Sequence, residues 1–402
     1  MKKRAGIDRE VTAKWRPQTR LVRGGTMRSE HGETSEAIFV TSGFSYDTAE
    51  SAEARFDGRE DGYTYSRQTN PTVTMFEERM ALIEGAEVGK ATATGMAAMT
   101  TALLAGLKAG DHVVGGRALF GSCRYLMDTL LPQFGIETTV VDGRDTEAWA
   151  RAVRPNTRMF FFETPANPTL DIVDIRAVAD IAHAHDIRVI VDNVFATPLL
   201  QKPLELGADI VCYSATKHID GQGRCLGGMI LCDRAFHDDY LYPFHRHTGP
   251  MLAPFEAWVL LKSLETLELR VTKMCENAAV VADHLAERLP GVRYPGRTDF
   301  DQHELAMRQM TLGGSVVTME LPGGRDSAFR LMNALEIIDI SNNIGDARTI
   351  ITHPATTTHK AVEPADQREM GITPGMLRLS VGLEDARDLI ADLDQAIEAA
   401  GG

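Results

Sequence analysis

With 402 residues, of which 44% are hydrophobic and 24% charged, the chain is long enough for two domains and has the composition of an ordinary folded globular protein. Its 42 basic and 56 acidic residues leave a net charge of −14, which disfavours nucleic acid or an anionic membrane as a partner. No stretch approaches the roughly 20 apolar residues of a membrane span, and polar sequence follows Met1–Arg4, so we expect a cytoplasmic protein.

The first 60 residues are predicted to form an arm. Residues 1–60 are rich in charge and weakly periodic, and Gly24–Gly25 and Asp57–Gly58 interrupt them. Arms of this kind commonly pack on a second subunit, so we expect contacts between subunits here.

Residues 61–255 are predicted to form a large domain. Helix-like stretches alternate there with short apolar runs at Asp111–Val114, Ile136–Val141, Met159–Phe162, Arg188–Val191 and Asp209–Cys212. Strands separated by helices favour an α/β fold with a mainly parallel sheet that is covered on both faces.

Residues 256–402 are predicted to form a smaller α+β domain. A long helical pattern opens at Pro250–Pro254 and continues to Leu289, bridging into this domain. It is followed by predicted strands at 315–321 and 376–381 and predicted helices at 328–335 and 383–399.

The cysteines and histidines indicate neither a disulfide framework nor a metal centre. The cysteines are odd in number and contain no Cys-x-x-Cys pair; they are Cys123, Cys212, Cys225, Cys232 and Cys275. The pairs His183/His185 and His245/His247 lack a third ligand at metal-like spacing. We therefore expect reduced thiols and no metal.

Two neighbouring apolar runs end in complementary polar groups. Asp192 follows the run Arg188–Val191, and Ser214, Thr216 and Lys217 follow the run Asp209–Cys212. Carboxyl ends of parallel strands form the ligand-binding edge of such sheets. A pyridoxal phosphate site needs a lysine for the Schiff base, a carboxylate for the pyridine nitrogen and hydroxyl donors for the phosphate. On its own, a Ser-x-Thr-Lys motif is more often part of a solvated turn. The ends of the two predicted strands, taken together, favour a site for this cofactor.

Gly95 stands where small residues lead into a helical pattern, within Thr92–Ala98. A glycine lets a ligand approach the backbone, and the first N–H groups of a helix bind phosphate. Tight helix packing would explain Gly95 on its own, whereas Ser214 and Thr216 make it part of a plausible phosphate cup.

From about Thr19 to Ala399, the sequence resembles the fold-type I pyridoxal phosphate enzymes of cysteine and methionine metabolism. Its motifs occur in the same order as in that family. That family includes cystathionine γ-synthase, cystathionine γ-lyase, methionine γ-lyase and the homoserine sulfhydrylases. The resemblance implies a seven-stranded sheet, a Schiff base on Lys217 and pairing of Asp192 with the pyridine nitrogen. It also implies phosphate contacts from Gly95, Met96, Ser214 and Thr216.

Four further positions take roles from the same resemblance. Tyr65 and Arg67 match a pair that binds the phosphate of the neighbouring subunit, and Asn167 is placed by the phenolic oxygen of the cofactor. Arg378 matches the arginine that clamps the substrate carboxylate, a bidentate task that suits a guanidinium. The resemblance also implies a homotetramer that is built from two dimers and has active sites shared between subunits. Without the resemblance, Tyr65 and Arg67 would be a solvated loop and Arg378 an edge charge.

The sequence departs from the family pattern at two positions. Phe120 replaces a tyrosine that stacks on the cofactor ring, so stacking is retained and Lys217 must carry most proton transfers. Asn343 replaces a serine that contacts the substrate carboxylate. Arg224, shortly after Lys217, could face a second carboxylate of the substrate, although an interface ion pair explains it equally well.

The resemblance implies a γ-replacement that makes L-homocysteine from O-succinyl-L-homoserine and hydrogen sulfide in methionine biosynthesis. Alternatives on the same scaffold are an O-acetylhomoserine sulfhydrylase, a cystathionine γ-synthase and a γ-lyase. A cofactor-binding regulator without catalysis is disfavoured, because Lys217, Asp192 and Arg378 are all present and no basic DNA-binding module is visible.

Overall fold

Two sheets organise the protein. The computed structural model describes residues 9–401. The larger sheet has the strand order β1-β7-β6-β5-β4-β2-β3, with strands β1 Val88–Thr92, β2 His112–Gly116, β3 Glu137–Val141, β4 Thr157–Glu163, β5 Arg188–Asp192, β6 Ile210–Ser214 and β7 Gly228–Cys232. The smaller sheet has the order β8-β11-β10-β9, with β8 Val316–Glu320, β9 Asp339–Ile340, β10 Ile350–Thr352 and β11 Met376–Ser380.

The larger sheet is mainly parallel, which confirms the predicted fold class. β3, β2, β4, β5 and β6 run parallel to one another, and β7 is antiparallel to both β6 and β1. The carboxyl ends of β4, β5 and β6 therefore meet at one edge, where open α/β sheets bind their ligands.

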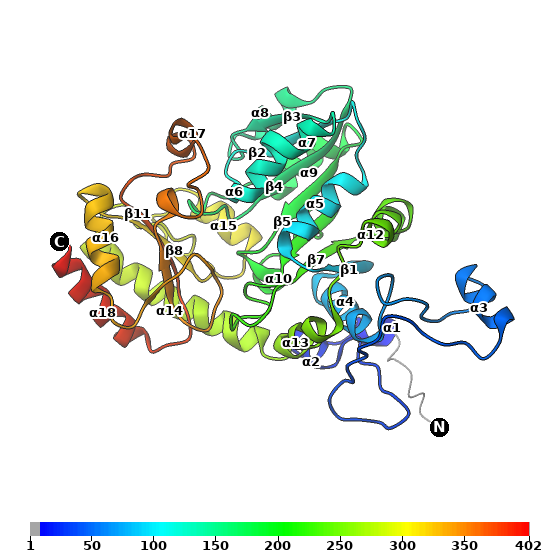
Figure 1. Cartoon of the computed structure of the whole chain (residues 1–402). Coiled ribbons are helices and arrows are strands. Elements are labelled where there is room, and N and C mark those ends of the chain that lie inside the picture. The colour runs from blue at the N-terminus through cyan, green and yellow to red at the C-terminus, as the bar shows by residue number, and fades with distance from the viewer. Residues whose placement is uncertain (1–8, 402) are drawn as a thin grey trace.

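Helices cover both sheets (Figure 1). On the larger sheet, α4 Pro71–Glu84, α8 Thr146–Ala152, α9 Ile175–His183 and α13 Pro254–Leu264 contribute to the core of one face, and α5 Gly95–Ala105 covers the other. On the smaller sheet, α14 Leu267–Arg288, α16 Gly324–Ala334 and α18 Ala386–Ala399 share one core. No helix within residues 9–401 is long and apolar enough to cross a membrane.

Shorter helical segments complete the chain. They are α1 Arg9–Thr12, α2 Pro17–Arg23, α3 Ala49–Phe56, α6 Gly121–Tyr125, α7 Leu131–Gln133, α10 Thr197–Leu200, α11 Arg234–Phe236, α12 Tyr242–Thr248, α15 His303–Gln309 and α17 Pro364–Glu369, the π-helical turns Leu126–Leu130 and His237–Leu241, and the 3₁₀ turn Pro354–Thr356.

The long helical pattern predicted to continue to Leu289 forms two helices, because α13 ends at Leu264 and α14 begins at Leu267. Side chains from Ala257 to Cys275 pack into the core of the larger sheet, and those from Ala278 onward pack on the smaller one. One helical stretch thus anchors both sheets. The division of the chain into domains at residues 60 and 255 stays a prediction.

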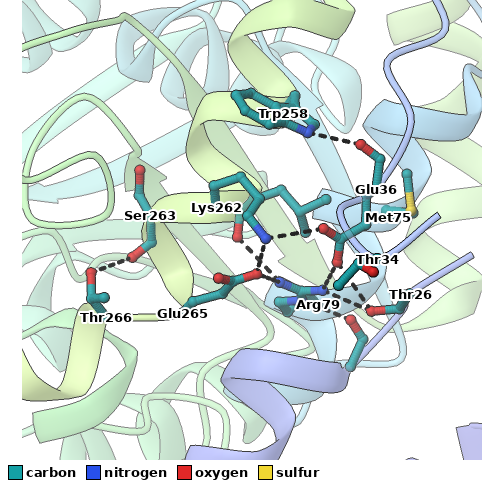
Figure 2. Close-up of polar contacts among 12 residues, drawn as sticks. Thr26, Thr34, Glu36, Met75, Arg79, Trp258, Lys262, Ser263, Glu265 and Thr266 are labelled. Atoms are coloured by element: carbon teal, nitrogen blue, oxygen red, sulfur yellow. Dashed lines mark hydrogen bonds and ion pairs between the residues drawn. The ribbon is translucent and has the colours of Figure 1, made fainter.

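A buried charge cluster fastens the N-terminal segment to α4 and α13. We name it the Arg79 cluster: Thr26, Glu36, Arg79, Lys262 and Glu265 (Figure 2). The Arg79 guanidinium is fully buried on α4 and donates to Glu36 Oε1 and Thr26 Oγ1, both at 3.0 Å. Lys262 on α13 donates to Glu36 Oε2 at 3.2 Å and also contacts Glu265. The cluster therefore joins the arm, α4 and α13.

Arg79 also satisfies backbone acceptors on both sides of the cluster. Its Nε donates to the Gly24 carbonyl at 2.7 Å, and its Nη1 donates to the Leu261 carbonyl at 3.2 Å. Removing one member of a buried ion pair leaves the other member uncompensated, which is strongly destabilising. Arg79 is therefore the member on which the whole cluster depends.

Replacing Arg79 by methionine keeps an unbranched apolar stem but leaves Glu36 buried without its main partner. We expect the Arg79→Met variant to lose about 3–5 kcal/mol in free energy of unfolding, measured by urea denaturation. The double variant Arg79→Met/Glu36→Gln should recover part of that loss, because it no longer buries a lone carboxylate. Arg387→Met, which breaks an exposed pair with Asp385, serves as control and should leave the urea midpoint unchanged. A native midpoint for Arg79→Met would contradict this account.

Candidate active site

The start of α5 meets the end of β6 at the ligand-binding edge of the larger sheet. Thr94 caps the helix, since its Oγ1 accepts a hydrogen bond from the Ala97 N–H at 3.0 Å. A Cβ on Gly95 would lie 2.5 Å from the Ser214 Cβ, so only glycine allows this approach. The first N–H groups of a helix have no partner inside the helix, and Gly95, Met96 and Ser214 line the same cavity. The two elements form a small cup suited to an anion.

Asp192 and Lys217 extend this cup into a reactive centre. Asp192 ends β5, is 5% exposed, and accepts a hydrogen bond from the Val194 N–H at 3.1 Å. Its burial raises the pKa of the carboxyl above the ordinary aspartate value. Lys217 follows β6, and its Nζ donates to Asn343 Oδ1 at 2.5 Å. Burial, together with the nearby Arg378 charge, lowers the pKa of Lys217 to about 8, so the amine reaches its neutral, nucleophilic form more readily than a solvated lysine.

Arg378 brings the smaller sheet to the same place. It lies in the middle of β11 and is 2% exposed. Its Nη1 donates to Asn167 Oδ1 at 2.8 Å, and its Nη2 donates to the carbonyls of Asn342 at 2.9 Å and Asn343 at 3.0 Å. Its buried Nε has no hydrogen-bond partner in the described part of the chain, and an incoming carboxylate would satisfy it.

One cavity of about 220 Å³ collects these groups. Nine of the residues predicted from the sequence line it: Gly95, Met96, Phe120, Asn167, Asp192, Ser214, Thr216, Lys217 and Arg378. Asn343 reaches the same place through its bond to Lys217. The sequence prediction thus named residues that the fold does bring together.

Three predicted positions lie elsewhere in this chain. Tyr65 and Arg67 do not line the cavity; the Tyr65 side chain is 42% exposed, and the Arg67 guanidinium lies 5.3 Å from its ring centre. Arg224 pairs with the buried carboxylate of Asp220 at 3.0 Å and donates to Ser263 Oγ at 2.5 Å. Within one chain Arg224 therefore forms a structural ion pair, and its contact with substrate stays a prediction.

Glu163 is a cavity residue that the sequence prediction did not name. It ends β4, is 3% exposed, and its Oε2 accepts a hydrogen bond from the Phe120 N–H at 2.8 Å. Burial, with repulsion from Asp192, raises the pKa of the Glu163 carboxyl well above its usual range. A carboxylate at the end of a buried apolar strand is the same signal that identified Asp192, and it could have identified Glu163 as well.

A second cavity, of about 200 Å³, also touches Glu163 but has different chemistry. Its arginines are neutralised by neighbouring acids: Arg293 pairs with Asp171 at 2.8 Å and Arg144 with Asp301 at 2.6 Å. Its lining contains no lysine. The reactive amine belongs to the first cavity alone.

The first cavity fits pyridoxal phosphate. The cup at Gly95 and Ser214 suits the phosphate, the buried Asp192 carboxylate suits a protonated pyridine nitrogen, and the Lys217 amine suits the aldehyde. The free Nε of Arg378 leaves a donor for an amino-acid carboxylate. No group of three or more metal-binding side chains occurs in the described residues. Fold and site together define a pyridoxal phosphate-dependent enzyme of fold type I.

Comparisons with known proteins define the family. The sequence model described as "Cys/Met metabolism PLP-dependent enzyme" matches residues 18–398, and the chain belongs to this family. It is 51% identical over 386 residues to an O-succinylhomoserine sulfhydrylase of Mycobacterium tuberculosis strain H37Rv, covering 94% of each chain. It is 46% identical over 384 residues to an O-succinylhomoserine sulfhydrylase of Pseudomonas aeruginosa, covering 95% of each chain.

A solved structure supports the cofactor. The chain matches, with a TM-score of 0.91 and 32% identity, a Campylobacter jejuni crystal structure described as an O-acetylhomoserine (thiol)-lyase. The match covers 96% of this chain and 100% of that one, which carries N′-pyridoxyl-lysine-5′-monophosphate.

The lowered pKa of Lys217 can be tested without substrate. In the cofactor-free protein, labelling of Lys217 by acetic anhydride should increase with pH with a midpoint near pH 8, because only the neutral amine reacts. Peptide mass spectrometry measures the labelled fraction, with free Nα-acetyl-lysine in the same tube as reference. A Lys217 profile that coincides with that of the free amino acid would contradict the proposed effect of burial.

Proposed function

We propose that this enzyme makes L-homocysteine by γ-replacement, from O-succinyl-L-homoserine and hydrogen sulfide, in the methionine biosynthesis of the cytoplasm. The observation that carries the proposal is that the Lys217 amine, the Asp192 carboxylate and the Arg378 guanidinium share one cavity. The succinyl substrate is proposed from the names of the two bacterial relatives, whose identity extends over nearly the whole chain.

Each of the main cavity residues has a separate role. The Arg378 guanidinium binds the substrate α-carboxylate through its free Nε, and Asn167 and Asn343 hold the guanidinium in place. Lys217 removes the proton from the substrate Cα. Pyridoxal phosphate, when bound, supplies the electron sink, and Asp192 stabilises the protonated form of its ring nitrogen.

Phe120 determines how the later proton transfers are made. A phenylalanine supplies apolar contact to a cofactor ring but has no proton to exchange. Lys217 therefore also carries the proton at Cβ, a task for which a pKa near 8 is well matched. Overall, the Cγ–O bond breaks, succinate leaves, and a Cγ–S bond forms with hydrosulfide.

A substrate matrix tests the proposal. The purified holoenzyme is given O-succinyl-, O-acetyl- or O-phospho-homoserine, each with hydrosulfide, cysteine or no thiol, and the products are separated by mass spectrometry. We expect the highest kcat/KM for homocysteine from the succinyl ester and hydrosulfide, and no product from Lys217→Ala. Cystathionine as the main product would instead indicate a cystathionine γ-synthase, and 2-oxobutyrate formed without thiol a γ-lyase. Preference for the acetyl ester would indicate an O-acetylhomoserine sulfhydrylase.

We also propose that the active sites are shared in a dimer and that two dimers form a homotetramer. Tyr65 and Arg67 lie outside the cavity of their own chain; Tyr65 is exposed, and Arg67 is half-buried and donates to the Arg246 carbonyl. The loop that carries them is firmly held, because the Ser66 N–H donates to the Ser42 carbonyl at 2.9 Å and Asn70 caps α4. The helix α3, which precedes this loop, has no buried residue and projects from the body of the chain (Figure 1). A second subunit would cover it.

Complementation between two inactive variants tests the shared site. Lys217→Ala and Arg67→Ala should each be nearly inactive alone, the second through weak cofactor binding. Refolded together in equal amounts, they should regain up to about a quarter of native sites, because about half of random dimers are mixed and each mixed dimer holds one intact site. Native mass spectrometry verifies that mixed dimers form. Mixed dimers without activity would refute the shared-site proposal.

A further inference from the structure

A buried chain of hydrogen bonds lies next to the strand ends that carry the active site. Its side chains are Glu84 at the end of α4, Tyr213 in β6, Asn193 after β5 and Gln201 after α10. Glu84 and Asn193 are 0% exposed, and Tyr213 and Gln201 are 1% exposed. We name these four residues the strand-end chain.

From Gln201 to Glu84, each side chain of the strand-end chain donates a hydrogen bond to the next one. The Gln201 side-chain amide donates to the Thr164 carbonyl at 2.9 Å and to Asn193 Oδ1 at 2.8 Å. The Asn193 amide donates to the Tyr213 hydroxyl oxygen at 2.6 Å, and that hydroxyl donates to Glu84 Oε2 at 2.6 Å. Since a tyrosine hydroxyl has a single proton to give, the Asn193 donor on one side and the Glu84 acceptor on the other fix its orientation.

The chain touches three strand ends beside active-site residues. Thr164, Asn193 and Tyr213 are the immediate sequence neighbours of three residues that line the cavity, namely Glu163 of β4, Asp192 of β5 and Ser214 of β6. It thus spans three adjacent strands at the point where each delivers a side chain to the cavity.

The strand-end chain does not itself line the cavity. Successive side chains of a strand point to opposite faces, and Tyr213 accordingly packs in the core on the α4 face while Ser214 lines the cavity. None of Glu84, Asn193, Gln201 and Tyr213 is among the lining residues. Any influence on the reaction must therefore pass through the backbone of the strand ends.

Stability alone does not account for so many buried polar groups. Glu84 Oε1 and Gln201 Oε1 are buried without a hydrogen-bond partner in the described residues, and each unsatisfied group of this kind costs stability. Well-packed apolar side chains often serve a core as well as a buried charged network does. Apolar packing is not directional. Hydrogen bonds are directional, so they fix the relative positions of the groups they join.

We propose that Glu84, Tyr213, Asn193 and Gln201 are positioning residues that set the relative offsets of the β4, β5 and β6 ends. Through these offsets they hold Glu163, Asp192 and Ser214 in the arrangement that the cofactor requires. The proposal goes beyond the reaction proposed above and does not depend on which acyl-homoserine the enzyme uses.

The Tyr213→Phe variant removes one oxygen and interrupts the strand-end chain at its centre. In the holoenzyme we expect kcat to fall about tenfold while KM changes by less than about twofold, because misplaced catalytic groups slow the reaction more than they weaken binding. The visible circular dichroism of the bound cofactor, recorded without substrate, should change as well. Kinetics are measured with the best substrate of the matrix described above.

Tyr294→Phe is the matched control. Tyr294 is 2% exposed, and its hydroxyl donates to the Gly314 carbonyl at 3.0 Å in the core of the smaller sheet. This variant loses a comparable buried hydrogen bond away from the strand-end chain. It should lose thermal stability but keep the native kcat and the native cofactor spectrum.

A second pair of variants tests the acceptor end of the chain. Glu84→Gln keeps a carbonyl oxygen for the Tyr213 hydroxyl, whereas Glu84→Met keeps the length of the side chain and removes the acceptor. We expect kcat and the cofactor spectrum of Glu84→Gln to stay near native and those of Glu84→Met to resemble Tyr213→Phe. If Tyr213→Phe does not fold, this pair of variants tests the positioning proposal instead.

Two results would overturn the proposal: native kcat and cofactor spectrum in both Tyr213→Phe and Glu84→Met, or equal changes in Tyr294→Phe. The spectrum is read without substrate, so it remains informative if no acyl-homoserine is turned over. Such inactivity of the native enzyme would refute the proposed reaction and not the positioning role.

Discussion

The placement of three ionisable groups in one cavity, two of them buried and Lys217 half-buried, is the constraint that the rest of the structure satisfies. Asp192, Lys217 and Arg378 each lose hydration there, and a buried charge is tolerated only when partners compensate it. Asn343 compensates Lys217, a backbone N–H compensates Asp192, and Asn167 with two carbonyls compensates Arg378. Because Arg378 belongs to β11, the smaller sheet must dock at the strand ends of the larger one. Both sheets are thus needed to complete the cavity.

Much of the fold could be predicted from the sequence, because most strands of the larger sheet are continuous apolar runs. β1 and β7 were not recognised individually. β1 contains Lys90, which is 4% exposed and pairs with Glu77 at 3.1 Å, so a tertiary ion pair makes a charged residue acceptable in a buried strand. β7 is a short buried run that follows glycines, a pattern equally typical of a loop. The interruption between α13 and α14 has no glycine or proline to announce it.

Much of the site could be predicted as well, and the reasons for the gaps differ. Asp192 and Lys217 were identified because they follow apolar runs, whereas Arg378 needed the family resemblance, since only the folded chain shows that it is buried among acceptors. Glu163 ends an apolar strand as Asp192 does, so the same signal points to it. The pairing of Arg224 with Asp220, four residues earlier, depends on a turn conformation that spacing alone does not specify. The strand-end chain joins residues from Glu84 to Tyr213 and has no local signature at all.

The central place of Arg378 in β11 limits how this chain can vary. Neighbouring side chains on a strand face opposite ways, so a slip of one residue in the pairing of β11 with β8 and β10 would turn the guanidinium out of the cavity and bring Leu377 or Leu379 into it. A single-residue insertion or deletion within β11 would therefore remove the proposed carboxylate-binding group from the cavity and place a charged guanidinium in the apolar core that the smaller sheet shares with α14, α16 and α18. The mostly exposed stretch at 360–369 ahead of it, which contains α17, belongs to no strand of either sheet and can accept length changes more easily. Length variation among functional homologues should accordingly be more frequent in that stretch than in the five residues that follow Gly375.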